Sequence, residues 1–234
     1  MAGLTKLYRK LLTRYGPQGW WPLLELHRGR KGTNPTKTGS MRGYHPGDFS
    51  YPRTERQRFE IAVGAILTQN TSWVNVEKAL LALEKAGLID PERMRMAREE
   101  ELRMPIRPAG YFNQKAKKLK AFAAFYRALE GRTPTREELL ALWGIGPETA
   151  DSILLYAYRV PEFVIDAYTR RVLAAQGFLT GKETYDKVKA FCEKGLPKDV
   201  KTYQEFHALL VEHAKRLRPA RRAGRPGKKP VRKE

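Results

Sequence analysis

A lone carboxylate, Asp166, follows a glycine turn by twenty residues and lies in the apolar context Val-Ile-Asp-Ala-Tyr. The turn is Gly144-Ile145-Gly146, and the residue after it, Pro147, favours the first turn of a helix. Glycines let the backbone turn tightly, and the free N–H groups that begin the next helix form a site for an anion. The segment therefore predicts chemistry by a carboxylate beside a bound phosphate group.

The charge of the chain indicates which molecule would bring that phosphate. Lys and Arg number 45 against 25 Asp and Glu, which gives a formal net charge of +20 over 234 residues. Such an excess repels itself in the folded state and is most easily explained by a polyanionic partner, so it favours nucleic-acid binding over a merely soluble surface. Residues 218–234 are too charged to pack, and we expect a disordered basic tail that attracts DNA without reading its sequence.

The elements that must position these residues are predicted to be helices. Apolar residues recur at helical spacing in 3–15 and in many segments after residue 55, while no segment reads convincingly as a strand ladder, so we expect an all-α fold. Residues 27–54 are rich in Gly, Pro, Thr and basic residues, which predicts a long loop, either disordered or laid across a surface. The helices expected after residue 55 cover 55–70, 73–87, 91–103, 112–130, 135–143, 147–159, 166–176, 183–193 and 202–217.

Composition also excludes several classes of site. The single cysteine, Cys192, rules out an intramolecular disulfide and any cluster held by several cysteines. The four histidines have no metal-ligand spacing, so no metal and no cofactor are expected. No apolar run approaches the ~20 residues of a membrane span, and no signal peptide is evident. We expect an intracellular monomer, cytoplasmic and associated with the nucleoid.

Three segments carry a joint resemblance that none would carry alone. They are FEIAVGAILTQNTSW at 59–73, RPAGYFNQKAKKL at 107–119, and LWGIGPETADSILLYA with VIDAYTRR between 142 and 171. In this order they resemble the helix-hairpin-helix DNA glycosylases of the endonuclease III superfamily. The similarity covers residues 55–215 and is closest to the 3-methyladenine DNA glycosylase branch that lacks an iron–sulfur cluster.

The resemblance implies two all-α lobes with a DNA cleft between them. Residues 55–163, with the hairpin at 142–149, would form a six-helix barrel lobe, and residues 1–54 with 164–217 would form the second lobe. Asp166 matches the catalytic acid of the superfamily. It would stabilise the positive charge left on the sugar when a base departs, or orient the attacking water. Asp166 could also cap the helix that follows, and the two roles can coexist.

The resemblance also indicates how double-stranded DNA with a damaged base would be held. The hairpin residues expected at a phosphate are Leu142, Gly144, Ile145, Gly146 and Thr149. Further backbone contacts are expected from Lys115, Lys118, Arg170 and Arg171. A solvated helix face explains lysines next to a loop equally well. Flipping a base leaves a hole in the duplex, and Gln69 and Tyr111 match the loop positions that fill it, although Gln69 could instead bond to backbone.

Two departures from the superfamily narrow the expected activity. Members that also cut the DNA backbone carry a lysine in the hairpin, and Glu148 stands at that position here. Because a carboxylate cannot form a Schiff base, the resemblance implies a monofunctional glycosylase without AP lyase activity. Glu148 could be a first-turn helix residue or could face the pocket. Where many relatives carry four cysteines, this chain has HAKRLRPARR, so no iron–sulfur cluster is expected.

Aromatic residues suggest the substrate. The branch carries a Trp-Trp-Pro segment that lines its base pocket, and Trp20, Trp21 and Pro22 stand in a comparable position here, with Trp73 as the matching aromatic after LTQNT. Purines methylated at N3 or N7 are cationic and stack well on electron-rich indoles. Plain core packing would explain each tryptophan equally well.

The leading hypothesis is therefore base excision of alkylated purines such as 3-methyladenine or 7-methylguanine. Three alternatives stay open at this point. The chain could excise uracil, mismatched thymine or another damaged base, because pocket specificity depends on few residues. It could be a bifunctional glycosylase and lyase if another lysine reaches the site. It could also recognise damage without catalysis, although binding alone has no need of a buried acid.

Overall fold

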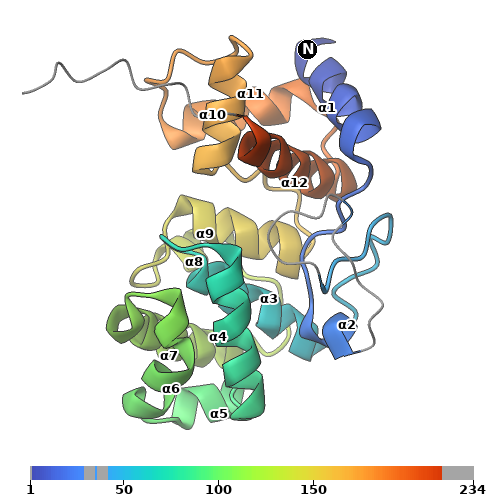
Figure 1. The fold of residues 1–234 in the computed structure, drawn as a ribbon. Coiled ribbons are helices and arrows are strands. Elements are labelled where there is room, and N and C mark those ends of the chain that lie inside the picture. Colours follow the sequence, from blue (N-terminus) through green and yellow to red (C-terminus); the bar gives the residue numbers. More distant parts are fainter. Residues whose placement is uncertain (1, 29–34, 36–41, 218–234) are drawn as a thin grey trace, which may run out of the picture.

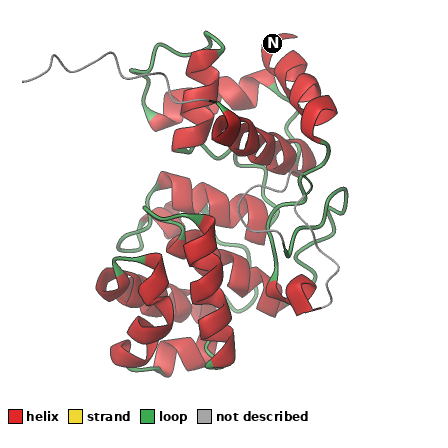
Figure 2. Cartoon of the chain, in the orientation of Figure 1, coloured by secondary structure: helices red, strands yellow, loops and turns green. Residues whose placement is uncertain are grey.

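The computed structural model describes residues 2–28, 35 and 42–217, and over this part of the chain the expected all-α fold is confirmed, with helices joined by loops and no β-strand (Figure 2). The expected tail at 218–234 lies outside the described residues, as does much of the expected loop at 27–54. The α-helices are α1 (Ala2–Tyr15), α2 (Leu24–Arg28), α3 (Glu55–Leu67), α4 (Trp73–Lys85), α5 (Pro91–Met96), α6 (Glu99–Ile106), α7 (Phe112–Ala128), α8 (Arg136–Leu140), α9 (Pro147–Ser152), α10 (Ala167–Ala175), α11 (Tyr185–Gly195) and α12 (Val200–Arg216).

The helices lie in two groups (Figure 1). In one, α5 and α6 pack against α7, and α4 packs against α6. In the other, α12 packs against α10 and α1, and α1 also contacts α11. We propose that these groups are the two lobes expected from the sequence.

A short π-helical turn, η2 (Ile153–Ala157), joins the two groups. It continues α9 and contacts both α3 and α12. The sequence predicts one regular helix over 147–159, but the α-helical part ends at Ser152. All five residues of η2 are buried, so other helices pack against this turn on both sides. The change from α-helix to π-helix is local, and the spacing of apolar residues in the sequence does not reveal it.

The segment between α1 and α2 also spans the two groups. The Gln18 N–H donates to the buried Glu205 carboxylate on α12 at 2.6 Å, and the Leu24 N–H donates to the buried Glu60 carboxylate on α3 at 2.8 Å. Helix α2 therefore lies against the first group, although the sequence assigns residues 1–54 as a whole to the second lobe. Trp20 and Trp21 lie between these two attachment points.

Several helix ends follow from local chemistry. The Thr54 side chain caps α3 by accepting a hydrogen bond from the Gln57 N–H. Thr135 and Glu138 form a reciprocal capping box at α8. Within the part of the chain that the structure describes, no helix is both long and apolar enough to cross a membrane. The same residues contain no group of three His, Cys, Asp or Glu that could hold a metal ion.

Candidate active site

Asp166 caps the N-terminus of α10 and faces a histidine. Its Oδ1 accepts a hydrogen bond from the Thr169 N–H at 2.6 Å, and its Oδ2 lies 3.6 Å from His207 Nε2. Burial alone would raise the pKa of the Asp166 carboxyl, but His207 and the Thr169 N–H outweigh it and hold this pKa below its ordinary value. Asp166 is therefore ionised at neutral pH, and its side chain keeps 14% exposure toward solvent.

A cavity of about 230 Å³ opens at this carboxylate. It brings together residues that lie far apart in the sequence and that the sequence assigns to a base pocket. These lining residues are Trp20, Trp21, Pro22, Trp73 and Glu148, and Asp166, which the sequence assigns as the catalytic acid, lines the same cavity. The cavity thus combines an acid with several aromatic rings.

The tryptophan rings meet at steep angles. Trp21 lies edge-on to Trp73, with centroids 5.4 Å apart, and Trp20 lies edge-on to His207 at 5.7 Å. Trp21 is buried, whereas Trp20 and Trp73 are only partly buried. The rings therefore pack on one another as core residues do, and two of them also keep exposed surface in the cavity wall.

The second carboxylate of the cavity, Glu148, behaves differently from Asp166. Loss of hydration raises the pKa of Glu148, repulsion by Asp166 raises it further, and His207 partly opposes the shift. The environments of the two carboxyls thus move their pKa values in opposite directions. Paired acids of this kind are typical of sites where one group stays ionised and the other can hold a proton.

The glycine turn has the expected tight geometry. The Ile145 N–H donates to the Leu142 carbonyl at 3.1 Å, and Gly146 precedes α9 as its N-cap. Gly144 has a φ of +80°, and a Cβ added there would meet the Lys118 side chain at 2.4 Å. The positive φ therefore favours glycine at this position, and the Lys118 side chain would have to shift to admit a Cβ.

Gln69 is bonded to this turn. Its side-chain amide donates to the Gly144 carbonyl and to Thr149 Oγ1, both at 3.0 Å, and its Oε1 accepts from Lys118 Nζ at 2.5 Å. Both ends of the amide are thus occupied within the protein. Tyr111, by contrast, is 64% exposed and has a left-handed backbone with φ of +47°. Of the two residues expected to fill the gap in the duplex, Gln69 is hydrogen-bonded within the protein, whereas Tyr111 has an exposed ring, and both roles stay predictions.

The arginines after Asp166 are used partly inside the fold. Arg170 donates to the Glu183 carbonyl at 2.9 Å, and Arg171 donates to the Ala214 carbonyl. Each guanidinium has five N–H groups, so these bonds leave others for a phosphate. Their role at DNA stays a prediction.

Lys115 is placed differently from the expectation. Its side chain is 1% exposed, and its ammonium donates at 2.8 Å to the carbonyls of Leu67 and Ala109. Burial, with the nearby Lys118 ammonium second, lowers the pKa of Lys115 to about 8. An ammonium enclosed in this way cannot contact a phosphate, so the predicted contact is wrong for Lys115. The residue instead joins the end of α3 to the 3₁₀ turn η1 (Arg107–Ala109).

Replacing Lys115 with methionine should therefore lower stability rather than weaken DNA binding directly. Two buried carbonyls lose their donor, and we expect the free energy of unfolding to fall by about 2 kcal/mol. Chemical denaturation measures this. Lys117 is exposed on the same helix, and the same substitution there should change stability by less than about 0.5 kcal/mol. Equal losses in both variants would contradict the assigned role.

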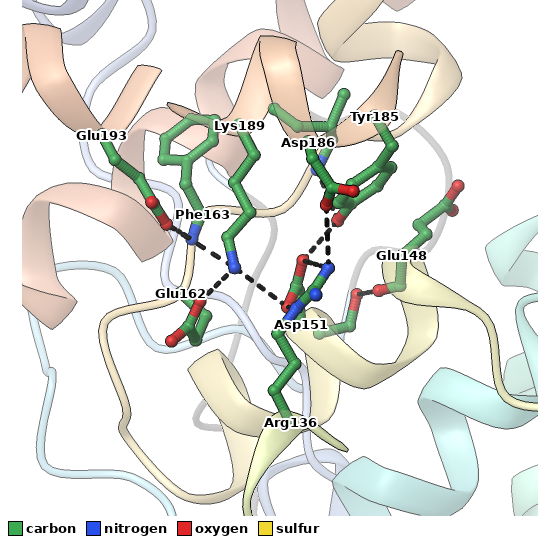
Figure 3. Close-up of polar contacts among 11 residues, drawn as sticks. Arg136, Glu148, Asp151, Glu162, Phe163, Tyr185, Asp186, Lys189 and Glu193 are labelled. Atoms are coloured by element: carbon green, nitrogen blue, oxygen red, sulfur yellow. Dashed lines mark hydrogen bonds and ion pairs between the residues drawn. The ribbon is translucent and has the colours of Figure 1, made fainter. Parts of the chain in front are cut away.

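A buried ionic network lies behind the site (Figure 3). Asp151 of α9 is fully buried and accepts from Arg136 at 2.7 Å, from the Tyr185 hydroxyl at 2.8 Å and from Lys189 at 3.2 Å. The Tyr185 oxygen in turn accepts the Ile165 N–H at 3.3 Å. The network thus fixes the backbone immediately before Asp166 to the helix that carries Glu148.

Sequence reasoning missed three residues of this region. Tyr185 has no motif of its own, and Asp151 was quoted only as part of the hairpin segment LWGIGPETADSILLYA, without a role. His207 entered the sequence analysis only as one of four histidines without metal-ligand spacing. It lies on α12, an amphipathic helix, and nothing in its spacing indicates that it faces Asp166.

Comparison with known proteins extends over most of the chain. The family of HhH-GPD superfamily base excision DNA repair proteins matches residues 63–198. A Methanocaldococcus jannaschii protein, provisionally named a DNA repair glycosylase, is 40% identical over 91% of this chain and 87% of its own length. Endonuclease III of Sulfolobus acidocaldarius is 30% identical over 71% of this chain and 77% of its own length. The crystal structure of an H. pylori 3-methyladenine DNA glycosylase bound to 1,N6-ethenoadenine matches with a TM-score of 0.61 and 32% identity, over 67% of this chain and 84% of that one.

Proposed function

Since this chain belongs to the HhH-GPD superfamily of base excision DNA repair proteins, we propose that it is a monofunctional DNA glycosylase that excises cationic alkylated purines, such as 3-methyladenine or 7-methylguanine, from double-stranded DNA. One observation carries the proposal. The carboxylate of Asp166 and the indoles of Trp20 and Trp73 line the same cavity. A flipped base held between the rings would place its sugar beside the acid.

In the proposed reaction the bond between the base nitrogen and the sugar C1′ breaks, and its electron pair leaves with the base. Positive charge then develops on the sugar. Asp166, kept ionised by His207 and the Thr169 N–H, would stabilise this charge at close range in a partly dehydrated cavity. Water adds to C1′, and Asp166 would orient it or accept its proton.

The aromatic wall supports the choice of substrate. Methylation at N3 or N7 gives the purine a positive charge, which weakens the glycosidic bond and favours stacking on indole faces. The H. pylori structure noted above is that of a 3-methyladenine DNA glycosylase. Recognition by charge and stacking would accept several alkylated purines, whereas a pocket of fixed hydrogen bonds would accept one.

The hairpin residue Glu148 supports hydrolysis without strand cutting. Strand cutting by this superfamily chemistry needs an amine that forms a Schiff base with C1′, and Glu148 cannot supply one. Glu148, whose pKa is raised by loss of hydration and by Asp166, lines the pocket and would instead help to anchor the departing base or the attacking water.

A second reaction class has one specific observation in its favour. Lys215 of α12 also lines the cavity, and burial lowers the pKa of its ammonium, with Glu212 opposing the shift. A lysine with a lowered pKa is a suitable nucleophile for a Schiff base. A lyase reaction through Lys215 is therefore the alternative to hydrolysis alone.

The deciding experiment uses the full-length protein and duplexes that each contain one lesion. The set comprises 3-methyladenine, 7-methylguanine, hypoxanthine, uracil, and thymine opposite guanine. We expect release of the methylated purines at rates at least 10-fold above the rest, and strand breaks only after alkali. Equal rates on uracil would reject the substrate assignment.

Borohydride reduction during the same reactions separates the two reaction classes. Hydrolysis leaves no covalent product, whereas a Schiff base is trapped as a protein–DNA adduct. An adduct that forms with the wild type and disappears with Lys215→Gln would establish the lyase alternative and reject the monofunctional proposal.

A further inference from the structure

His207 lies at the back of the cavity in a setting that packing alone does not require. Its side chain is 5% exposed, its Nδ1 is 2.7 Å from the Tyr156 hydroxyl oxygen, and its Nε2 is 3.6 Å from Asp166 Oδ2. Within the described part of the chain, Nε2 makes no hydrogen bond. The imidazole thus has one buried nitrogen directed at a carboxylate and the other bonded to a phenol. Enzymes use comparable arrangements to orient a catalytic side chain.

The two partners of His207 fix which of its nitrogens carries hydrogen. Tyr156 is fully buried, and burial raises the pKa of its hydroxyl well above the ordinary value, so it stays a phenol. Its O–H can donate to Nδ1, or to the Gln204 carbonyl at 3.3 Å. When the O–H donates to Nδ1, the shorter of the two contacts at 2.7 Å, Nδ1 is the acceptor and the ring hydrogen lies on Nε2, which faces the Asp166 carboxylate. His207 therefore presents a donor to Asp166.

We propose that His207 is a positioning residue for the glycosidic reaction: its Nε2–H holds the Asp166 carboxylate ionised and correctly oriented in the cavity, and Tyr156 holds the imidazole in place. The inference rests on the proposed function, since it concerns the same carboxylate. It adds a chain of three side chains from α10, α12 and η2, of which the sequence identified only the first.

The competing explanation is packing. His207 lies edge-on to Trp20, whose ring lines the same cavity, so a variant could lose activity because the wall moves. The two explanations differ in whether a hydrogen-bond donor is needed at the position of Nε2. Glutamine can place its amide near the Nε2 position and still donate to Asp166, whereas leucine fills space without donating.

The acid side of the pH–rate profile provides a second readout. Asp166 must be ionised to act, and His207 is one of the groups that lower its pKa. Removing the donor raises that pKa and shifts the acid limb to higher pH. The other titratable groups that line the cavity are Tyr44, Glu148, Tyr168 and Lys215, and Tyr156 lies behind His207. These are unchanged in the His207 variants.

The experiment measures single-turnover excision of 7-methylguanine by full-length His207→Leu, His207→Gln and Tyr156→Phe between pH 5 and 9. We expect His207→Leu to lower the rate about 100-fold, a loss typical of a misplaced catalytic group, and to shift the acid limb to higher pH. His207→Gln should recover most of the rate, and Tyr156→Phe should shift the limb in the same direction. Affinity for undamaged DNA should stay within twofold in all three.

Equal losses in the leucine and glutamine variants, with an unchanged acid limb, would overturn the proposal in favour of packing. If His207→Leu does not fold, as judged by circular dichroism, the glutamine and Tyr156→Phe profiles decide the matter, and an unshifted limb in Tyr156→Phe counts against the proposal. His213 lies on the same helix and bonds to Tyr15 instead, so His213→Gln should leave the profile unchanged. Failure of the proposed function would look different, because the wild type would then release no alkylated purine.

Discussion

Asp166→Asn should lower the single-turnover rate of base excision by at least about 1000-fold, which is the upper range for removing one electrostatic stabiliser from a dehydrated site. The substitution removes the negative charge that faces the developing positive sugar. It preserves volume, and the amide oxygen can still accept the Thr169 N–H. The helix cap therefore survives, and stability should change little. Excision of 7-methylguanine under single-turnover conditions, with a thermal melt beside it, measures both.

A matched control lies on another helix. Asp199 caps α12 through the same type of hydrogen bond, accepting the Thr202 N–H at 2.8 Å, and it is not among the residues that line the cavity. Asp199→Asn makes the same substitution at a helix cap that lies outside the catalytic site. The excision rate of this variant should stay within about twofold of the wild-type rate. A loss below about 10-fold in Asp166→Asn would remove Asp166 from its assigned role.

Asp151→Asn should lower the free energy of unfolding by about 3 kcal/mol, because it removes the anion from a buried network and leaves two cations in place. The cations are Arg136 and Lys189, both of which contact Asp151 directly. Equilibrium denaturation in urea measures the loss. Since the same network holds the backbone before Asp166 through Tyr185, excision should fall as well.

The neighbouring Asp186 provides the comparison. Its carboxylate also contacts Arg136, at 3.4 Å, but its side chain is 78% exposed. Ion pairs exposed to water contribute little, so Asp186→Asn should cost less than about 1 kcal/mol. Equal losses at the two positions would show that burial of Asp151 does not set the stability of this network.

Local chemistry explains what the sequence predicted well. The glycine turn and the helix that begins at Pro147 depend on residues within one or two turns of each other, and both are present. The pocket could be predicted only through the resemblance. Trp20 and Trp73 lie on separate segments, and no periodicity connects them.

The residues that were misplaced depend on distant packing. Lys115 lies among three further lysines, a pattern typical of a solvated face, yet the carbonyl of Leu67, 48 residues away, binds its ammonium. His207 meets Asp166 because α12 packs against α10. Neither the Lys115 contact nor the His207 contact can be predicted from local sequence, since each forms only when distant segments of the chain pack together.

The buried ammonium of Lys115 has a mechanical consequence. It binds the last carbonyl of α3, two residues before Gln69, and a carbonyl of η1, two residues before Tyr111. Because one ammonium binds the backbone before both loops, a movement of the loop at Gln69 is coupled to a movement of the loop at Tyr111. The spacing between Gln69 and Tyr111 is consequently set in the free protein, and if both take their predicted role at DNA, they would meet it at this fixed separation.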